Sequence, residues 1–221
     1  MRWIRKALKW TGGAVILSAV AYAIFSLVVR PSLDRNWNKD QAVLARAAFD
    51  GDRVTITNIR NIHYRSTSDY DVRYYDKTFD LRKLDSVWFV VEPFAGHGFG
   101  AAHTLVSFGF EGGEYVAISA EIRKEVGESF SAVKGLFRQY ELVYVIADER
   151  DLIKLRSNFR KDQVFVYPVK TTRENMRRFF VSMLNRANKL ATEPEFYNTL
   201  TKTCTTSQPF CRAGGSGTTS T

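Results

Sequence analysis

AAHTLVSFGFEGGEYVAISAEIR, residues 101–123, is the stretch that decides the fold of this chain. It holds two mostly apolar runs, residues 101–110 and 115–122, on either side of Glu111-Gly112-Gly113-Glu114. Both runs are rich in β-branched and aromatic residues, and paired glycines between such runs are typical of a tight turn. The stretch therefore predicts two antiparallel strands joined as a hairpin.

Further strands and helices are predicted on both sides of this hairpin. Alternation of apolar and polar residues indicates a strand at 53–59, and the continuous apolar run 86–91 indicates a strand buried on both faces. Residues 142–147 and 164–167 are also predicted strands, and 149–159 have helical spacing. Strands and helices interleave without strict alternation, so the predicted class is α+β, with a mixed, mostly antiparallel sheet and packed helices.

The clearest predicted helix follows Thr171. Thr171 and Glu174 form a T-x-x-E pattern, which is typical of a capping box at a helix N-terminus. Apolar residues then recur at spacings of three and four, and Pro194 is expected to stop the helix.

An apolar segment near the N-terminus predicts a membrane anchor. Residues 10–29, WTGGAVILSAVAYAIFSLVV, contain no charge, and a helix of this length spans about 30 Å, the thickness of the hydrocarbon core of a bilayer. The alternative is a cleaved signal peptide, because residues 19–21 and 21–23 both fit the small-x-small cleavage pattern. Apolar residues continue past both sites to Val29, which favours an uncut anchor.

Charge near this segment predicts its orientation. Arg2, Arg5, Lys6 and Lys9 precede it without any acidic residue, which places the N-terminus in the cytoplasm by the positive-inside rule. The expected layout is a cytoplasmic N-terminus (1–9), a transmembrane helix (10–29), a linker with a short helix at 39–49 (30–52), a periplasmic domain (53–206), and a low-complexity, disordered and truncated-looking tail (207–221). We therefore expect a single-pass protein of the inner membrane.

Composition removes several function classes. The net charge is +9, but four basic residues precede the apolar segment, so the rest of the chain carries only +5, and no nucleic-acid partner is expected. Two cysteines are too few for a four-cysteine zinc site, and the three histidines form no HExxH motif. No phosphate-binding or dinucleotide-binding glycine motif is present. We therefore expect neither a metal nor another cofactor.

The hairpin carries the first candidate site residue, His103. In a strand, His103 shares its face with Ala101, Leu105 and Ser107, which is the less apolar face of the run. Pairing across the Gly112-Gly113 turn brings Ser119 or Glu121 close to His103. A shift of one residue in the register would move these side chains to the opposite face.

A late cysteine completes the set of groups that thiol chemistry needs. A thiol becomes a good nucleophile when an imidazole holds it as thiolate and a third polar group orients that imidazole. Cys204, in the polar segment EPEFYNTLTKTCTT, is the candidate thiol. Two alternatives remain open: His103 is a structural residue of its strand, or Cys204 forms a disulfide with Cys211 in an oxidising compartment.

Several blocks of the sequence, taken together, are similar to a known family. The blocks are YDKTFDLRKLDSVWFVVEPF, AHTLVSFGF, AISAEIRKEVGESF, LFRQYELVYVIADERDLIKLRSNFR and EFYNTLTKTCTT. With them, the stretch from about Asn58 to Thr206 resembles the Lnb N-terminal periplasmic domain family of the bacterial envelope. More distantly, the order of histidine before Asn-x-x-x-x-x-Cys-Thr is similar to circularly permuted papain-like enzymes of the NlpC/P60 type.

The second resemblance implies a permuted papain-like fold and a thiol hydrolase, amidase or acyltransferase. It implies Cys204 as nucleophile, His103 as base and Glu121 as orienting group, with Tyr197, Asn198 and Ser119 lining the substrate site. One feature departs from that pattern, because the papain-like cysteine opens a long helix whereas Pro209 and the Gly/Ser/Thr tail permit about one turn.

This departure keeps a second function open. In this alternative, the short C-terminus leaves the domain without enzyme activity, and the chain acts as a non-catalytic periplasmic binding or accessory domain. Residues 148–178 are rich in Lys and Arg, and anionic lipid or a cell-envelope polymer is the partner that such a surface would suit.

Overall fold

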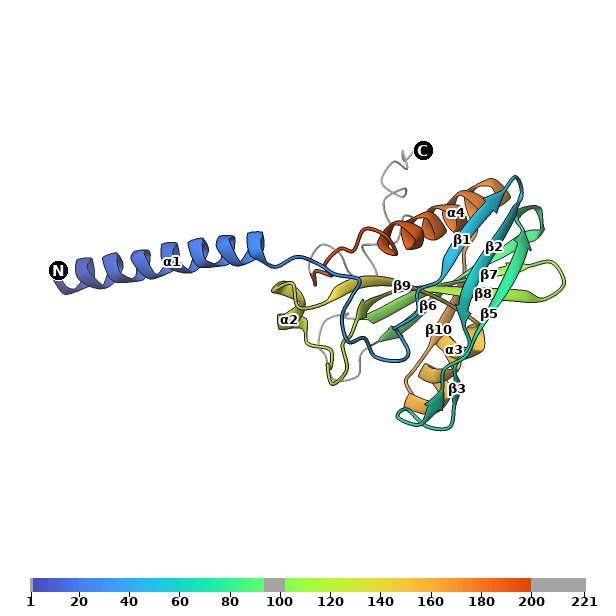
Figure 1. Cartoon of the computed structure of the whole chain (residues 1–221), viewed down its shortest axis with the longest axis horizontal. Helices are drawn as coiled ribbons and strands as arrows, with labels where there is room; N and C mark the ends of the chain where they lie inside the picture. Colours follow the sequence, from blue (N-terminus) through green and yellow to red (C-terminus); the bar gives the residue numbers. More distant parts are fainter. Residues whose placement is uncertain (1, 94–101, 200–221) are drawn as a thin grey trace, which may run out of the picture. The chain divides into compact units, whose positions relative to one another are not determined.

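The apolar N-terminal segment forms one continuous helix, α1 (Arg2–Val28), in the computed structural model of Figure 1, which describes residues 2–93 and 102–199. The chain divides into two compact units, Met1–Ser32 and Leu33–Thr221. Within α1, residues Trp10–Val28 have a mean hydropathy of 1.9 and no buried side chain. This segment is long and apolar enough to cross a membrane, as the sequence predicts.

The second unit is built on a mixed sheet. In the described residues its strands are β1 (Arg46–Asp50), β2 (Arg53–Arg60), β5 (Tyr74–Asp80), β6 (Leu84–Pro93), β7 (Ala102–Phe110), β8 (Glu114–Arg123), β9 (Glu141–Ala147) and β10 (Phe165–Pro168). Their order is β1-β2-β9-β8-β7-β6-β10, and β5 also pairs with β2. All described pairings are antiparallel except that of β2 with β9. The α+β class with a mixed, mostly antiparallel sheet is confirmed.

The central hairpin has the predicted form. Gly112 and Gly113, with φ of +91° and +78°, make the turn between β7 and β8, in the left-handed region that favours glycine. The register pairs Leu105 with Ser119 and Phe108 with Val116. Because side chains alternate along a strand, this register decides which residues of the two strands share a face.

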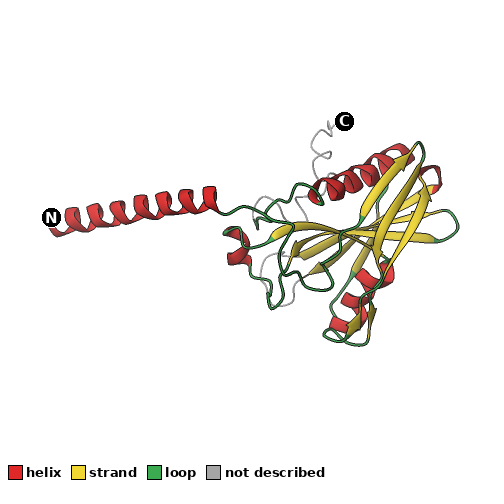
Figure 2. Cartoon of the chain, viewed as in Figure 1, coloured by secondary structure: helices red, strands yellow, loops and turns green. Residues whose placement is uncertain are grey.

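Each face of the sheet is covered by helices (Figure 2). On one face, α4 (Arg173–Leu190) buries Phe180 against Phe108, with ring centroids 4.8 Å apart, in the larger of two apolar clusters. On the other face, Leu152 of α3 (Glu149–Lys154) joins Leu105 and Ala117 in a smaller cluster. A π-helical turn, η2 (Leu155–Arg160), continues α3 across that second face.

Three local predictions are wrong. Residues 39–49 form no helix: the stretch ends in β1, which pairs with β2 through a turn at Gly51, and this pairing overrides helical propensity. Helix α4 is capped by Thr172, whose side chain accepts from the amide of Asn175, rather than by Thr171. β6 is only partly buried on both faces, since its outer neighbour β10 is a short and exposed edge strand.

Besides β1, five described elements were not predicted from the sequence. They are β3 (His63–Tyr64), β4 (Tyr70–Asp71), β5 (Tyr74–Asp80), the 3₁₀ turn η1 (Leu81–Lys83) and α2 (Ala132–Leu136). The hairpin of β3 and β4 is a separate two-stranded sheet.

Candidate functional site

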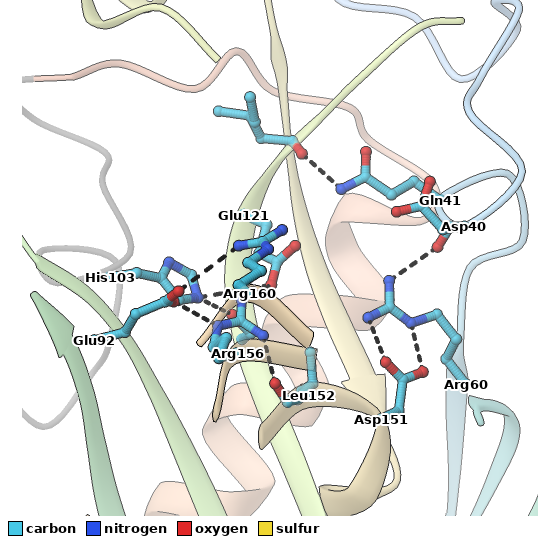
Figure 3. Close-up of polar contacts among 12 residues, drawn as sticks. Asp40, Gln41, Arg60, Glu92, His103, Glu121, Asp151, Leu152, Arg156 and Arg160 are labelled. Atoms are coloured by element: carbon cyan, nitrogen blue, oxygen red, sulfur yellow. Dashed lines mark hydrogen bonds and ion pairs between the residues drawn. The ribbon is translucent and has the colours of Figure 1, made fainter. Parts of the chain in front are cut away.

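His103 and its predicted neighbours meet on the face of the sheet that α3 and η2 cover. The Nε2 atom of His103 lies 2.9 Å from Oγ of Ser119 and 3.7 Å from Oε1 of Glu121 (Figure 3). The proximity expected from the hairpin register is therefore observed. The side chains of His103 and Glu121 are mostly buried, with exposed fractions of 12% and 17%.

A buried arginine joins two carboxylates beside the imidazole. Nε of Arg156 donates to Glu92 Oε2 at 2.7 Å, and Nη2 donates to Glu121 Oε1 at 3.0 Å. Its third donor, Nη1, reaches the carbonyl oxygen of Leu152 at 2.8 Å, so the guanidinium is held on every side. Arg160, one turn further along η2, lies 3.7 Å from Glu92. Figure 3 shows these groups converging from β6, β7, β8 and η2.

Sequence reasoning missed Glu92 and Arg156, although each left a signal. Glu92 lies near the end of an apolar strand and pairs in register with His103. Burying a carboxylate there costs free energy unless a partner balances its charge. Arg156 lies one helical turn beyond Leu152 and so falls on the buried face of its helix. A buried carboxylate and a buried arginine on separate elements indicate an ion pair, but only the fold identifies the partners.

The protein environment keeps the His103 imidazole neutral. Burial, followed by the positive charge of Arg156, lowers the pKa of His103 to about 3, and the carboxylate of Glu121 only partly opposes this. For Glu121, burial alone would raise the pKa, but Arg156, His103 and Arg60 together with a hydrogen bond from Ser119 lower it below its usual range. Near neutral pH the site therefore holds a neutral imidazole beside an ionised carboxylate.

These contacts also decide which ring nitrogen carries the proton. The carboxylate of Glu121 can only accept, so the Ser119 hydroxyl donates its single proton to it, and the Ser119 oxygen accepts from Nε2–H of His103. The nearby carboxylate favours the same tautomer. The other nitrogen, Nδ1, is then unprotonated and makes no hydrogen bond to any described residue. Nδ1 is therefore the ring nitrogen that can accept a proton; Glu121 favours the imidazolium that results, whereas burial and Arg156 oppose it.

A second buried ion pair fixes the helix that supplies Arg156. Asp151 of α3 accepts from Nε and Nη2 of Arg60 at 2.9 and 3.0 Å, and from the backbone amide of Ile62 at 2.9 Å. The hydroxyl of Tyr64 donates to the same carboxylate at 3.2 Å. Asp151 is fully buried, and its four contacts fasten α3 to β2 and β3.

The remaining predicted residues lie near the C-terminal end of the described chain. Tyr197 is buried and its backbone amide donates to the carbonyl of Tyr140 at 2.9 Å, while Asn198 is half-buried beside it. Phe196 bridges to Glu141 at the start of β9, so this segment runs along the sheet. Cys204 and Cys211 lie outside the described residues.

Side chains that could bind a metal do not cluster in the part of the chain that the structure describes. No group of three or more His, Cys, Asp or Glu side chains there is arranged to hold a metal ion.

Comparison with known proteins gives one match. A family model described as the Lnb N-terminal periplasmic domain matches residues 70–208, more than half of the chain. The matched region begins later than the resemblance at residue 58 suggests, but it includes Glu92, His103, Glu121 and Arg156. No curated protein and no solved structure matches the chain.

Proposed function

The chain belongs to the Lnb N-terminal periplasmic domain family, and from this premise we propose that it is a thiol enzyme tethered to the inner membrane. The family and the apolar helix α1 fit a single-pass protein with its folded domain in the periplasm. In this layout residues 1–9 are cytoplasmic and residues 10–29 cross the membrane. The reaction class is hydrolysis or acyl transfer at an amide or ester, with Cys204 as nucleophile and His103 as base.

The observation that carries this proposal is the neutral His103 ring, whose Nε2 contacts Ser119 and whose Nδ1 makes no hydrogen bond to any described residue. In the proposed reaction Nδ1 takes the proton of the Cys204 thiol as the sulfur attacks the substrate carbonyl. The imidazolium then returns that proton to the leaving amine or alcohol, which departs and leaves a thioester on Cys204. Water or a second acceptor attacks the thioester and gives its proton to His103. The carbon–sulfur bond then breaks, and the imidazolium returns the proton to the sulfur, which leaves as the thiol of Cys204.

Ser119 and Glu121 have supporting roles in this scheme. Ser119 fixes the ring through Nε2, and the ionised Glu121 stabilises the positive charge that forms during proton transfer. We further propose that Asn198 lines the substrate site, and that the fold is of the permuted papain-like type. Tyr197, also predicted to line that site, packs in the larger apolar cluster on the α4 face, whereas Leu105, on the same face as His103, belongs to the smaller cluster.

Chain length permits Cys204 to reach His103. Phe196 lies beside β9 and is therefore three strand spacings from β7, which carries His103. The two residues are also offset by two positions along the strand direction, so the distance from Phe196 to His103 is roughly 16 Å. The eight residues from Phe196 to Cys204 can extend to about 27 Å. The length of chain after Phe196 is therefore compatible with a meeting of thiol and imidazole.

The test is the pH dependence of alkylation at Cys204, measured on the full chain with Cys211→Ser so that one thiol reacts. Because the His103 ring is neutral, we expect it to act as the base that removes the thiol proton, so that Cys204 is alkylated faster than an ordinary thiol at neutral pH and more slowly in His103→Ala. His63→Ala is the matched control, because His63 is an exposed histidine in β3 and should leave the profile unchanged.

Two results would contradict the enzyme proposal. One is a Cys204 that reacts as an ordinary exposed thiol whether or not His103 is present. The other is a Cys204–Cys211 disulfide found by mass spectrometry in the native chain, because a bonded sulfur cannot attack a carbonyl. The second result would favour the alternative function, a non-catalytic periplasmic binding or accessory domain.

A further inference from the structure

Four large apolar side chains are exposed on and just before α2. Val126, Phe130, Val133 and Phe137 have exposed fractions of 59%, 51%, 64% and 52%, and we call them the α2 patch. Val133 lies in α2, Phe137 is its C-cap residue, and Phe130 immediately precedes its N-cap Ser131. Clusters of exposed apolar side chains on a folded domain mark contact surfaces more often than isolated ones do.

The α2 patch lies where the chain enters the folded unit. The backbone amide of Val126 donates to the carbonyl of Asn36 at 2.8 Å, and the amide of Asn38 donates to that of Lys124 at 2.9 Å. Between these bonds, Trp37 forms a β-bridge with Glu125. Residues 36–38, near the start of the folded unit, are thus bonded to residues 124–126, which precede α2.

The length of chain between α1 and this attachment is short. The candidate span ends at Val28, and eight residues later Asn36 is already bonded to Val126. Eight residues extend to at most about 27 Å, whatever path they take. If α1 crosses a membrane, the attachment point and the α2 patch beside it stay close to the lipid surface. The β7–β8 turn is at the other end of the same unit (Figure 1).

Charge around the α2 patch also suits a phospholipid surface. Lys134 is exposed within α2, and Lys124 and Arg138 flank the patch in sequence. The neighbouring acid Glu125 is engaged by Arg35 at 3.3 Å, and Glu128 accepts from Gln139 at 2.9 Å. Apolar side chains bordered by basic ones are the usual composition of segments that lie in the headgroup region.

We propose that the α2 patch docks on the outer surface of the membrane that α1 crosses, and inserts its apolar side chains into the headgroup region. This proposal rests on the anchor in the proposed function and is independent of chemistry at Cys204. The folded unit then has two membrane contacts, a span and a surface face. Two contacts hold the unit in one orientation on the membrane, which a single flexible tether does not.

The test measures the surroundings of a nitroxide at Val133 in the full chain. Val133→Cys is made with Cys204→Ser and Cys211→Ser, the protein is placed in vesicles of phosphatidylethanolamine and phosphatidylglycerol, and accessibility to oxygen and to a water-soluble nickel complex is compared. We expect the oxygen-to-nickel ratio at Val133 to be several-fold higher than at Tyr115→Cys. Tyr115 is the control because its side chain is also exposed but lies near the start of β8, at the opposite end of the folded unit.

A third label, at Val20→Cys within α1, separates the two ways of failing. A lipid signal at Val20 with a water signal at Val133 overturns the docking proposal and leaves the anchor intact. A water signal at Val20 overturns the anchor, and the docking proposal with it. A Val133 label shielded from both oxygen and nickel overturns lipid as the occupant, because protein then covers the patch, either a second copy or another chain.

Discussion

Arg156 and His103 are coupled through a single oxygen atom: Oε1 of Glu121 lies 3.0 Å from Nη2 of Arg156 and 3.7 Å from Nε2 of His103. The guanidinium keeps this carboxylate ionised and also opposes protonation of the imidazole. Arg156 therefore contributes, together with burial, to the protonation state of both neighbours, although it projects from a helix and they project from the sheet. π-helical turns such as the one that carries Arg156 occur frequently at functional sites.

Arg156→Met should destabilise the fold by about 3–5 kcal/mol, because it removes the closest counter-ion of two buried carboxylates and leaves Glu92 with only the more distant Arg160. Chemical denaturation of the full chain in detergent measures this loss. Arg178→Met is the control, since Arg178 pairs with Glu174 on the exposed surface of α4 and should change stability little. Equal effects of the two substitutions would contradict a buried network.

The same variant should raise the pKa of His103. Arg156 is the largest charge that lowers this pKa, and its removal leaves the raising effect of Glu121 less opposed. Titration of the His103 ring protons by NMR measures the shift, with the exposed His63 in the same spectrum as an internal reference. An unchanged His103 pKa would show that burial alone lowers it.

His103 should make the folded state less stable as the pH falls. Its folded pKa of about 3 is below the value of about 6.5 expected when unfolded, so between these pH values the unfolded state binds a proton that the folded state does not. The stability that the neutral His103 ring contributes is fully present above about pH 6.5. It is lost as the pH falls from about 6.5 to about 3, by at most about 1.4 kcal/mol per pH unit. Denaturation at several pH values should show a shallower dependence in His103→Gln than in the parent chain. Parallel curves would contradict the depressed pKa.

Asp151→Asn should cost about 3–5 kcal/mol, because it removes the charge that balances the buried Arg60 and weakens contacts to Ile62 and Tyr64. Asp69→Asn removes a carboxylate from Arg65 in an exposed pair and should have little effect. Thermal unfolding distinguishes them. Since Asp151 fastens α3, its loss should also raise hydrogen exchange through α3 and η2 before it affects β7 and β8.

The orientation of the anchor can be tested with reporters fused after Thr221. A reporter that folds only outside the cytoplasm should be active, because four basic residues precede the candidate span and hold the N-terminus inside. Changing Arg2, Arg5, Lys6 and Lys9 to neutral residues should reduce that activity. Activity of a cytoplasm-only reporter in the parent chain would contradict the topology.

Much of the sheet could be predicted because its signals are local. The apolar runs and the Gly112-Gly113 turn specified β7 and β8, and the turn also fixed the register that places Ser119 and Glu121 beside His103. By contrast, β1 was mistaken for helix, because a short strand is decided by the partner it pairs with rather than by its own propensity.

The sequence by itself therefore determined the apolar helix, the α+β class, the hairpin and the pairing of His103 with its two neighbours on β8. Only the tertiary structure decided that Glu92 and Arg156 complete this cluster and that Arg60 pairs with Asp151. The reason is physical: strand register and helical period are short-range and readable along the chain. The partner of a buried charge is chosen by which elements pack together, and Arg156 reaches a carboxylate 64 residues away.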